Sequence, residues 1–104
     1  MLQTIQIIGN LTADAELKVS QNGNEFVAFR VAVNENLGDE KRTTFYDVSY
    51  PKNKLFVYLK KGISIYVSGR LSISAVLGKD GKPYMNAYIN ARDVDLCGAP
   101  QKEN

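Results

Sequence analysis

The 104-residue sequence has no histidine, no tryptophan and a single cysteine, Cys97. A lone cysteine cannot form an intramolecular disulfide, so nothing in the sequence indicates an oxidising compartment. The usual zinc ligand sets are almost excluded, and we expect no metal and no cofactor. Histidine is the commonest general base, and no nucleophile motif such as G-x-S-x-G occurs. Only carboxylates and lysines remain for catalysis, so we expect that the protein is not an enzyme.

Long hydrophobic runs are also missing. Every uncharged run is shorter than the roughly 20 residues that cross a bilayer as a helix, and residues 1–13 lack the basic start and cleavage site of a signal peptide. We therefore expect a cytoplasmic protein with no membrane partner. The composition, 44% hydrophobic and 23% charged, is that of one folded domain. The formal net charge of +2 permits binding to a polyanion without requiring it.

Apolar and polar residues alternate along most of the chain, which is the period of a β-strand. The first strand is predicted from Ile5 to Val19, followed by an Asn22-Gly23 pair that suits a tight hairpin turn. The second covers residues 26–33. Three more strands are expected at residues 43–50, 63–73 and 84–96, with a polar loop at 34–42 and a turn at 78–81.

A short helix is predicted between the third and fourth strands. Pro51 ends the third strand because proline has no N–H for the ladder. Leu55, Tyr58 and Leu59 then have helical i, i+3, i+4 spacing, and residues 60–62 (KKG) supply the cations and the glycine typical of a helix C-terminus. We expect two helical turns, with Tyr58 in the core.

Five strands with one helix between the third and fourth is the order of the OB fold, a small Greek-key barrel. The predicted fold class is therefore all-β, an OB-fold barrel. In-strand glycines such as Gly9 and Gly69 are where its strands can bend. We expect residues 1–98 to form the barrel and residues 99–104 to form a short flexible tail.

Several segments, in order, resemble the bacterial single-stranded DNA-binding protein family. Residues 7–11 (IIGNL), 14–18 (DAELK) and the Asn22-Gly23 turn resemble the family's opening "V-G-N-L … D-P-E-V-R … N-G". Residues 29–34 (FRVAVN) are similar to its second strand. Residues 58–71 (YLKKGISIYVSGRL) closely match "Y-L-x-K-G-x-x-V-Y-V-x-G-x-L". The resemblance covers nearly the whole chain.

The chain also departs from the family pattern. Leu37, at the root of the long loop, and Pro51, after the third strand, stand where the family usually carries large aromatic residues. Residues 72–76 (SISAV) replace a basic and aromatic stretch. The family's long linker and acidic, phenylalanine-tipped tail, which recruits replication and repair proteins, has no counterpart in residues 101–104. The resemblance therefore implies a short form without the acidic tail.

Sequence-independent binding of single-stranded DNA needs exposed aromatic faces for the bases. Phe45 is the best candidate, because it is out of phase with Tyr46 and Tyr50, which we assign to the core, and because the family carries a stacking tryptophan on this strand. Tyr84 and Tyr88 share the polar face of the fifth strand. Tyr66 matches a family tyrosine that could instead serve subunit packing.

Binding also needs cations for the phosphates, and the resulting affinity falls with salt. The candidates are basic residues on outward strand phases and on the adjoining loops. They are Lys18, Arg30, Arg70, Lys41 and Arg42 at the base of the long loop, and Lys79 and Lys82 beside the last turn.

The function expected from these residues and from the resemblance is coating of single-stranded DNA in replication, recombination or repair. The resemblance implies a homotetramer, with a dimer as the fallback, and an open barrel leaves strand edges free for pairing. Two alternatives stay open. One is a primosomal accessory protein, a short dimeric relative. The other is an OB-fold module that contacts protein and has a reduced DNA surface.

Overall fold

The computed structural model describes residues 3–97, which are mostly β-strand. The strands are β1 (Thr4–Leu11), β2 (Glu16–Val19), β3 (Glu25–Leu37), β4 (Glu40–Pro51), β5 (Ser64–Leu77) and β6 (Pro83–Leu96), and a 3-10 helix, η1, spans Lys54–Tyr58. The predicted first strand is interrupted at residues 12–15, so that it becomes β1 and β2. The predicted tail at residues 99–104 lies outside the described residues. Within residues 3–97, no helix has the length and apolar character needed to span a bilayer.

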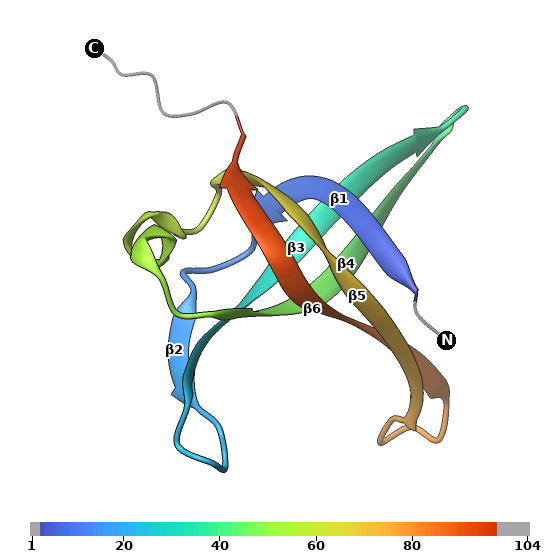
Figure 1. Ribbon diagram of the computed structural model, residues 1–104. Coiled ribbons are helices and arrows are strands. Elements are labelled where there is room, and N and C mark those ends of the chain that lie inside the picture. Colours follow the sequence, from blue (N-terminus) through green and yellow to red (C-terminus); the bar gives the residue numbers. More distant parts are fainter. Residues whose placement is uncertain (1–2, 98–104) are drawn as a thin grey trace.

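The strands form one closed barrel (Figure 1). Their order is β1-β5-β6-β4-β3-β2, and a further pairing of β1 with β3 completes the ring. All pairings are antiparallel except that of β4 with β6. With β1 and β2 counted as one interrupted strand, this is the five-stranded Greek-key arrangement of the OB fold. The predicted fold class is confirmed.

The parallel contact between β4 and β6, which we call the β4–β6 junction, is short. It joins Asp47 to Tyr88, Val48 to Ile89 and Ser49 to Asn90. Beyond the junction the two hairpins project away from each other (Figure 1). We call these projections the β3–β4 arm, residues 33–44, and the β5–β6 arm, residues 73–87.

The β3–β4 arm corrects the prediction of a long loop at residues 34–42. The ladder continues to the pair Leu37 and Glu40, and Gly38 turns the chain with a φ of 66°. Thr43 Oγ1 donates a hydrogen bond to Asn34 Oδ1 at 2.7 Å across the strands. Both faces of this arm are mostly polar. The sequence here lacks the hydrophobic alternation that predicts a strand, and for this reason the strand was missed.

The core lies inside the barrel and receives side chains from every strand except β2. Its buried residues are Ile7, Leu11, Val27, Phe29, Val31, Val48, Leu59, Ile65, Val67, Ile89, Ala91 and Val94. Tyr46 and Tyr50 are partly buried against it, as predicted. The inward phase continues into the β5–β6 arm, but there Ile73 and Met85 are exposed because the arm extends past the barrel.

Gly9 and Gly69 permit close approach of the strands, as their predicted role requires. A Cβ on Gly9 would lie 2.4 Å from the carbonyl oxygen of Ala32, and one on Gly69 would lie 2.3 Å from that of Asn90. Both distances are far shorter than a van der Waals contact with a backbone atom. Gly69 also lies at the irregularity where the register of β5 on β6 shifts. Only glycine fits at these two positions.

The predicted short helix is present between β4 and β5, but it is a five-residue 3-10 helix, η1, and not the two turns expected. Asn53 begins it by accepting a hydrogen bond from the Leu55 N–H at 2.8 Å. The chain cannot continue as a helix, because the next residues bond to the β1–β2 connection. The Leu59 carbonyl accepts from the Ala15 N–H at 2.9 Å, and the Gly62 N–H donates to the Leu11 carbonyl at 2.8 Å. Tyr58 is therefore 53% exposed and not in the core.

Leu59 is the residue of this segment that packs into the core of the barrel. It is only 1% exposed, whereas its near neighbour Val57 is exposed. Leu59→Ala should lower the free energy of unfolding by about 2–5 kcal/mol, from lost burial and the cavity left behind. Val57→Ala, the matched control, should change it by less than about 0.5 kcal/mol. Urea unfolding followed by tyrosine fluorescence measures both, and equal effects would contradict this placement of Leu59.

Candidate nucleic-acid interface

One row of outward-facing side chains crosses the β4–β6 junction. Arg30 on β3 pairs with Asp47 on β4, Asp47 with Tyr88 on β6, and Tyr88 with Ser72 on β5. We call the outer surface around this row the binding face. Neighbouring strands in a sheet are about 4.8 Å apart, so side chains of the row lie within reach of one another.

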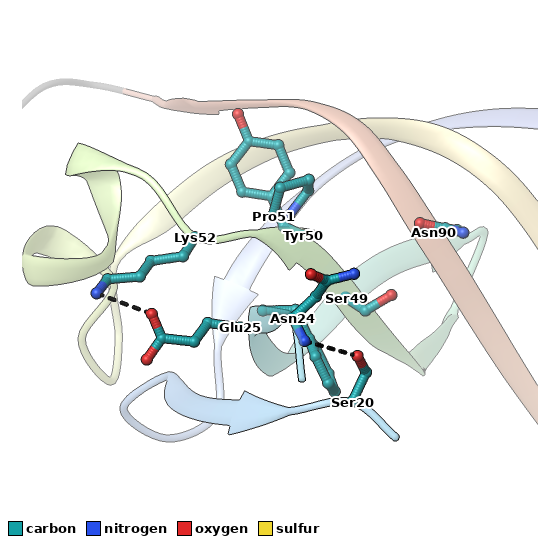
Figure 2. A pocket seen from close by; sticks show the side chains of 9 residues that line it. Ser20, Asn24, Glu25, Ser49, Tyr50, Pro51, Lys52 and Asn90 are labelled. Carbon is teal, nitrogen blue, oxygen red and sulfur yellow. Dashed lines mark hydrogen bonds and ion pairs between the residues drawn. The ribbon is translucent and has the colours of Figure 1, made fainter. Parts of the chain in front are cut away.

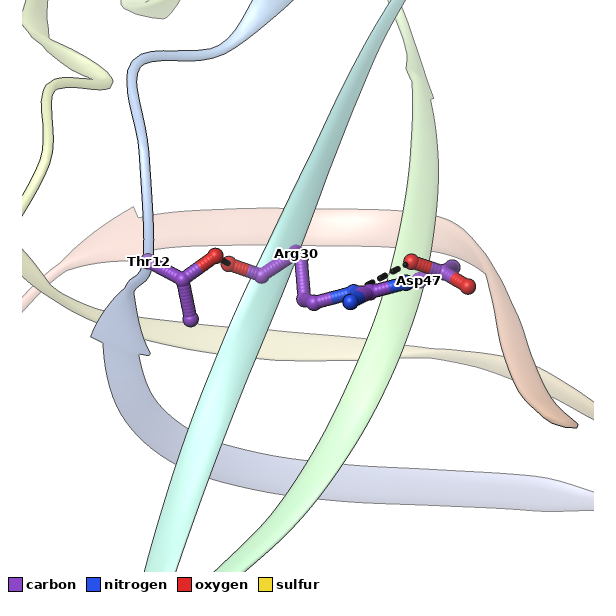
Figure 3. Close-up of polar contacts among 3 residues, drawn as sticks. All are labelled: Thr12, Arg30 and Asp47. Carbon is purple, nitrogen blue, oxygen red and sulfur yellow. Dashed lines mark hydrogen bonds and ion pairs between the residues drawn. The ribbon is translucent and has the colours of Figure 1, made fainter. Parts of the chain in front are cut away.

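An ion pair lies at the centre of the binding face. Arg30 Nε donates to Asp47 Oδ1 at 3.0 Å, across from β3 to β4 (Figure 3). This hydrogen bond, with the attraction of the carboxylate, raises the pKa of Arg30 above its ordinary value. On the other side, the Thr12 N–H donates to the Arg30 carbonyl at 3.0 Å and fixes the β1–β2 connection beside it. The guanidinium is therefore oriented by a carboxylate, which also offsets its charge toward a phosphate.

Aromatic rings flank the ion pair. Phe45 lies one pleat from Asp47 on β4 and is 52% exposed, while Tyr88, in register with Asp47, is 51% exposed. Both half-exposed rings lie on the outer side of the sheet, as the strand phase predicted. Phe26 on β3 is half-buried and also outward, between Lys18 and Pro51 in the register.

The binding face is hollowed along its length. A hollow of about 580 Å³ is lined by Lys18, Arg30, Asp47 and Tyr88 among others. It shares Phe26 and Ser49 with a second hollow of about 710 Å³, which continues to Pro51, Lys52 and Asn90 (Figure 2). A third, of about 420 Å³, begins at Pro51 and Asn90 and reaches Arg70 and Arg92. Together they form a continuous groove.

The groove is less positive than its basic residues suggest. Three cations that line it are paired with carboxylates: Lys18 with Glu16 at 3.9 Å, Lys52 with Glu25 at 3.3 Å and Arg30 with Asp47 at 3.0 Å. Within residues 3–97, Arg70 and Arg92 form no ion pair. The charge available to a polyanion therefore increases toward the Arg70 end.

The other predicted cations lie at the tips of the arms. Lys79 and Lys82 are exposed in the turn of the β5–β6 arm. Lys41 and Arg42, expected at the base of a loop, instead lie next to the turn of the β3–β4 arm, opposite Asn36 and Glu35. Leu37, expected at the root of that loop, is also beside this turn. The correction follows from the longer ladder, which carries these residues away from the barrel.

Tyr84 is held within its own arm. Its hydroxyl donates to Asp80 Oδ2 at 2.8 Å, which raises the pKa of Tyr84. The pKa of Asp80 is lowered, chiefly by the Lys82 N–H and also by Tyr84. A Cβ on Gly78 would collide with the Tyr84 ring, so the ring lies against the turn. Tyr84 therefore shapes the arm and still exposes about half of its surface.

Tyr66 lies apart from the other candidates. It pairs with Ile8 on β1 and Asp95 on β6, and it lines none of the three hollows. Its neighbour Ile8 is exposed. The pair Ile8 and Tyr66 forms a separate apolar spot on the outside of the barrel.

Groove residues that were missed as site candidates from the sequence include Phe26, Asp47, Asn90 and Arg92. The first three have the outward strand phase of Phe45 or Tyr88, and this signal could have found them. Arg92 is the extra residue at the irregularity between β5 and β6, where strand phase is lost. No group of three or more metal-ligating side chains occurs in the part of the chain described.

Comparison with known proteins gives a consistent result. The model of the Single-strand binding protein family matches residues 2–97. A single-stranded DNA-binding protein of Chlamydia muridarum is 34% identical, over 81% of this chain and 55% of its own length. The mitochondrial single-stranded DNA-binding protein of Schizosaccharomyces pombe is 39% identical, over 99% of this chain and 70% of its own. The chain thus spans just over half the length of the chlamydial relative.

Two solved structures share the fold. One is a small single-stranded DNA-binding protein from Streptomyces coelicolor, with a TM-score of 0.79, 23% identity, and coverage of 96% of this chain and 98% of that one. The other is a Plasmodium falciparum protein of the same kind in complex with single-stranded DNA, with a TM-score of 0.70, 22% identity, and coverage of 93% and 96%. Since the family model matches nearly every described residue, the chain belongs to the single-strand binding protein family.

Proposed function

We propose that this protein binds single-stranded DNA along the groove of the binding face, with little sequence dependence, and acts in replication, recombination or repair. The observation that carries the proposal is the groove itself, which Tyr88 and basic residues line, together with the half-exposed ring of Phe45 one pleat from Asp47 on the same face of this OB-fold barrel. Stacking on aromatic rings is tolerant of sequence, because every base has a π face.

The role assigned to the protein is binding alone, without catalysis and without a cofactor. A bound strand would be shielded from reannealing and from nucleases. The phosphates would follow Arg70, Arg92, Lys18 and the cations at the arm tips, Lys41, Arg42, Lys79 and Lys82. We place this activity in the cytoplasm, on the nucleoid, and assign the barrel to residues 1–98.

We further propose that the chain assembles as a homotetramer, with a dimer as the fallback. One edge of β1 is paired with β5, but the other meets β3 only at Asn10 and Leu11. Within the described residues, Thr4 to Gly9 therefore present main-chain groups without a strand partner on that edge. An unpaired strand edge is a template for pairing with another chain. The exposed side chain of Ile8 and the half-buried ring of Tyr66 would be covered by the same contact.

The alternative is an OB-fold module that contacts protein, in primosome assembly or elsewhere. The three paired cations and the polar stretch Ser72 to Ser74 favour it, since both weaken attraction for DNA. Absence of binding to oligo(dT) at about 50 mM salt, where phosphate contacts are strongest, would support the alternative.

The stacking role can be tested with two substitutions, Phe45→Ala and Tyr88→Ala. Each should weaken binding of oligo(dT) by about 1–3 kcal/mol, the usual contribution of a stacked base. Tyr58→Ala, which removes a ring of similar exposure on η1 outside the groove, should leave the affinity unchanged. Fluorescence anisotropy of labelled oligo(dT), at low and high salt, measures all three. Equal affinities for the variants and the wild type would show that the rings do not stack bases.

The oligomeric state can be tested by light scattering after size exclusion. The wild type should have the mass of a tetramer, or of a dimer at least. Ile8→Glu should shift it toward the monomer, because a charge on the exposed β1 spot cannot be buried unpaired in an interface. Ser74→Glu on the β5–β6 arm, the matched control, should leave the mass unchanged. A monomeric wild type at micromolar concentration would contradict the proposed assembly.

A further inference from the structure

We propose that Asp47, held by Arg30, reads the edge of a nucleobase and favours bases with an exocyclic amino group over thymine. This inference rests on the proposed function, because it concerns which base the binding face accepts at its centre. It gives Asp47 a function in DNA binding, at a position where a carboxylate would otherwise only repel DNA.

The geometry of the pair leaves one side of the carboxylate open. Arg30 Nε occupies Asp47 Oδ1 at 3.0 Å, and among the described residues no hydrogen bond reaches Oδ2. The Asp47 side chain is 33% exposed and lines the hollow that Tyr88 and Arg30 also line. A ligand in this hollow therefore meets an oriented acceptor oxygen that still lacks a donor.

The chemistry of an ionised carboxylate excludes phosphate as that ligand. The carboxylate only accepts hydrogen bonds, and a phosphodiester also offers only acceptors together with a negative charge. Arg30 and Asp47 together carry no net charge, so this pair attracts phosphate less than a cation without a carboxylate partner does. The centre of the binding face should therefore hold bases, with the phosphates displaced toward Arg70 and Arg92, which form no ion pair among residues 3–97.

The two rings place a base edge within reach of Asp47. Phe45 is on the same strand and face, one pleat away, and Tyr88 is its direct partner across the junction. A base that stacks on either ring lies over a neighbouring side-chain position, about 5–7 Å away, and its edge extends toward Asp47. Stacking supplies the affinity at this point, and the carboxylate supplies the selection.

The bases differ in what they offer to a carboxylate. Cytosine and adenine present an amino group, and guanine presents an amino group beside a ring N–H. Thymine presents only its N3–H, which is flanked by two carbonyl oxygens that would face the carboxylate. A contact from a carboxylate to the amino group of cytosine is an established form of base readout. Thymine should therefore be the least favoured base at this position.

Competition between oligo(dC) and oligo(dT) of equal length tests the inference directly. Both are pyrimidine strands, so differences in self-stacking are smaller than with purines. The quantity measured is the ratio of the two dissociation constants, by anisotropy at pH 8, for the wild type and for Asp47→Asn. The substitution keeps the shape of the side chain but adds a donor that suits a thymine carbonyl.

We expect the Asp47→Asn substitution to move the ratio toward oligo(dT) by about fivefold, the low end of discrimination by hydrogen bonds to a base. Glu25→Gln is the matched control, because Glu25 is another carboxylate of the groove, ion-paired with Lys52 at 3.3 Å. It removes the same charge and should strengthen both complexes equally, with the ratio unchanged.

Each outcome is decisive. A ratio that moves toward oligo(dT) only in Asp47→Asn supports base reading by Asp47, and a move toward oligo(dC) overturns it. A ratio that is the same in the wild type and in both variants, with clear binding of both strands, overturns the inference and leaves the proposed function intact. A ratio that shifts equally in both variants also overturns it, because charge alone would then explain the effect. No binding of either strand by the wild type overturns the proposed function together with the inference.

Discussion

The arrangement of the molecule depends on the three residue pairs of the β4–β6 junction. The central pair, Val48 and Ile89, faces inward and is buried, so that closure of the barrel completes the core. The flanking residues, Asp47 and Tyr88 with Ser49 and Asn90, face outward. The same contact therefore sets the spacing of the binding face. Because the core fixes the junction, the polar groups above it are placed by packing and not by the ends of the arms.

The electrostatics of the face follow from this placement. Each cation that lines the groove close to the junction has a carboxylate partner. Among the described residues, the cations without such partners lie at the Arg70 end, on the arms, and on and after η1. Exposed ion pairs contribute little to stability, so these three pairs do not explain the fold. Their effect is on ligand binding, because they lower the attraction for phosphate at the centre of the face. Aromatic and hydrogen-bonding groups are then the means of recognition there.

The sequence predicted the parts of the fold that depend on alternation and on the two strand glycines. It placed Phe45 and Tyr88 outside the barrel and Tyr46 and Tyr50 against the core, because strand phase decides these positions. It failed where tertiary contacts override local signals. The mostly polar sequence of the β3–β4 arm gave no signal of its ladder. The hydrogen bonds of Leu59 with Ala15 and of Gly62 with Leu11 ended the helix. The ion pair of Arg30 with Asp47 could not be predicted, because it depends on the register of β3 on β4, which no local sequence pattern gives.

The closed ring also separates the surfaces that binding and assembly would use. In the order β1-β5-β6-β4-β3, the strand β1 lies on the opposite side of the barrel from the β4–β6 junction. The Ile8–Tyr66 pair and most of the open edge of β1 therefore lie away from the junction, and only Thr4, at the start of β1, lines the Arg70 end of the groove among the β1 residues. A subunit added at β1 would cover apolar surface without covering Phe45, Asp47 or Tyr88. Copies joined in this way would turn their grooves outward, and one strand of DNA could then pass from one groove to the next.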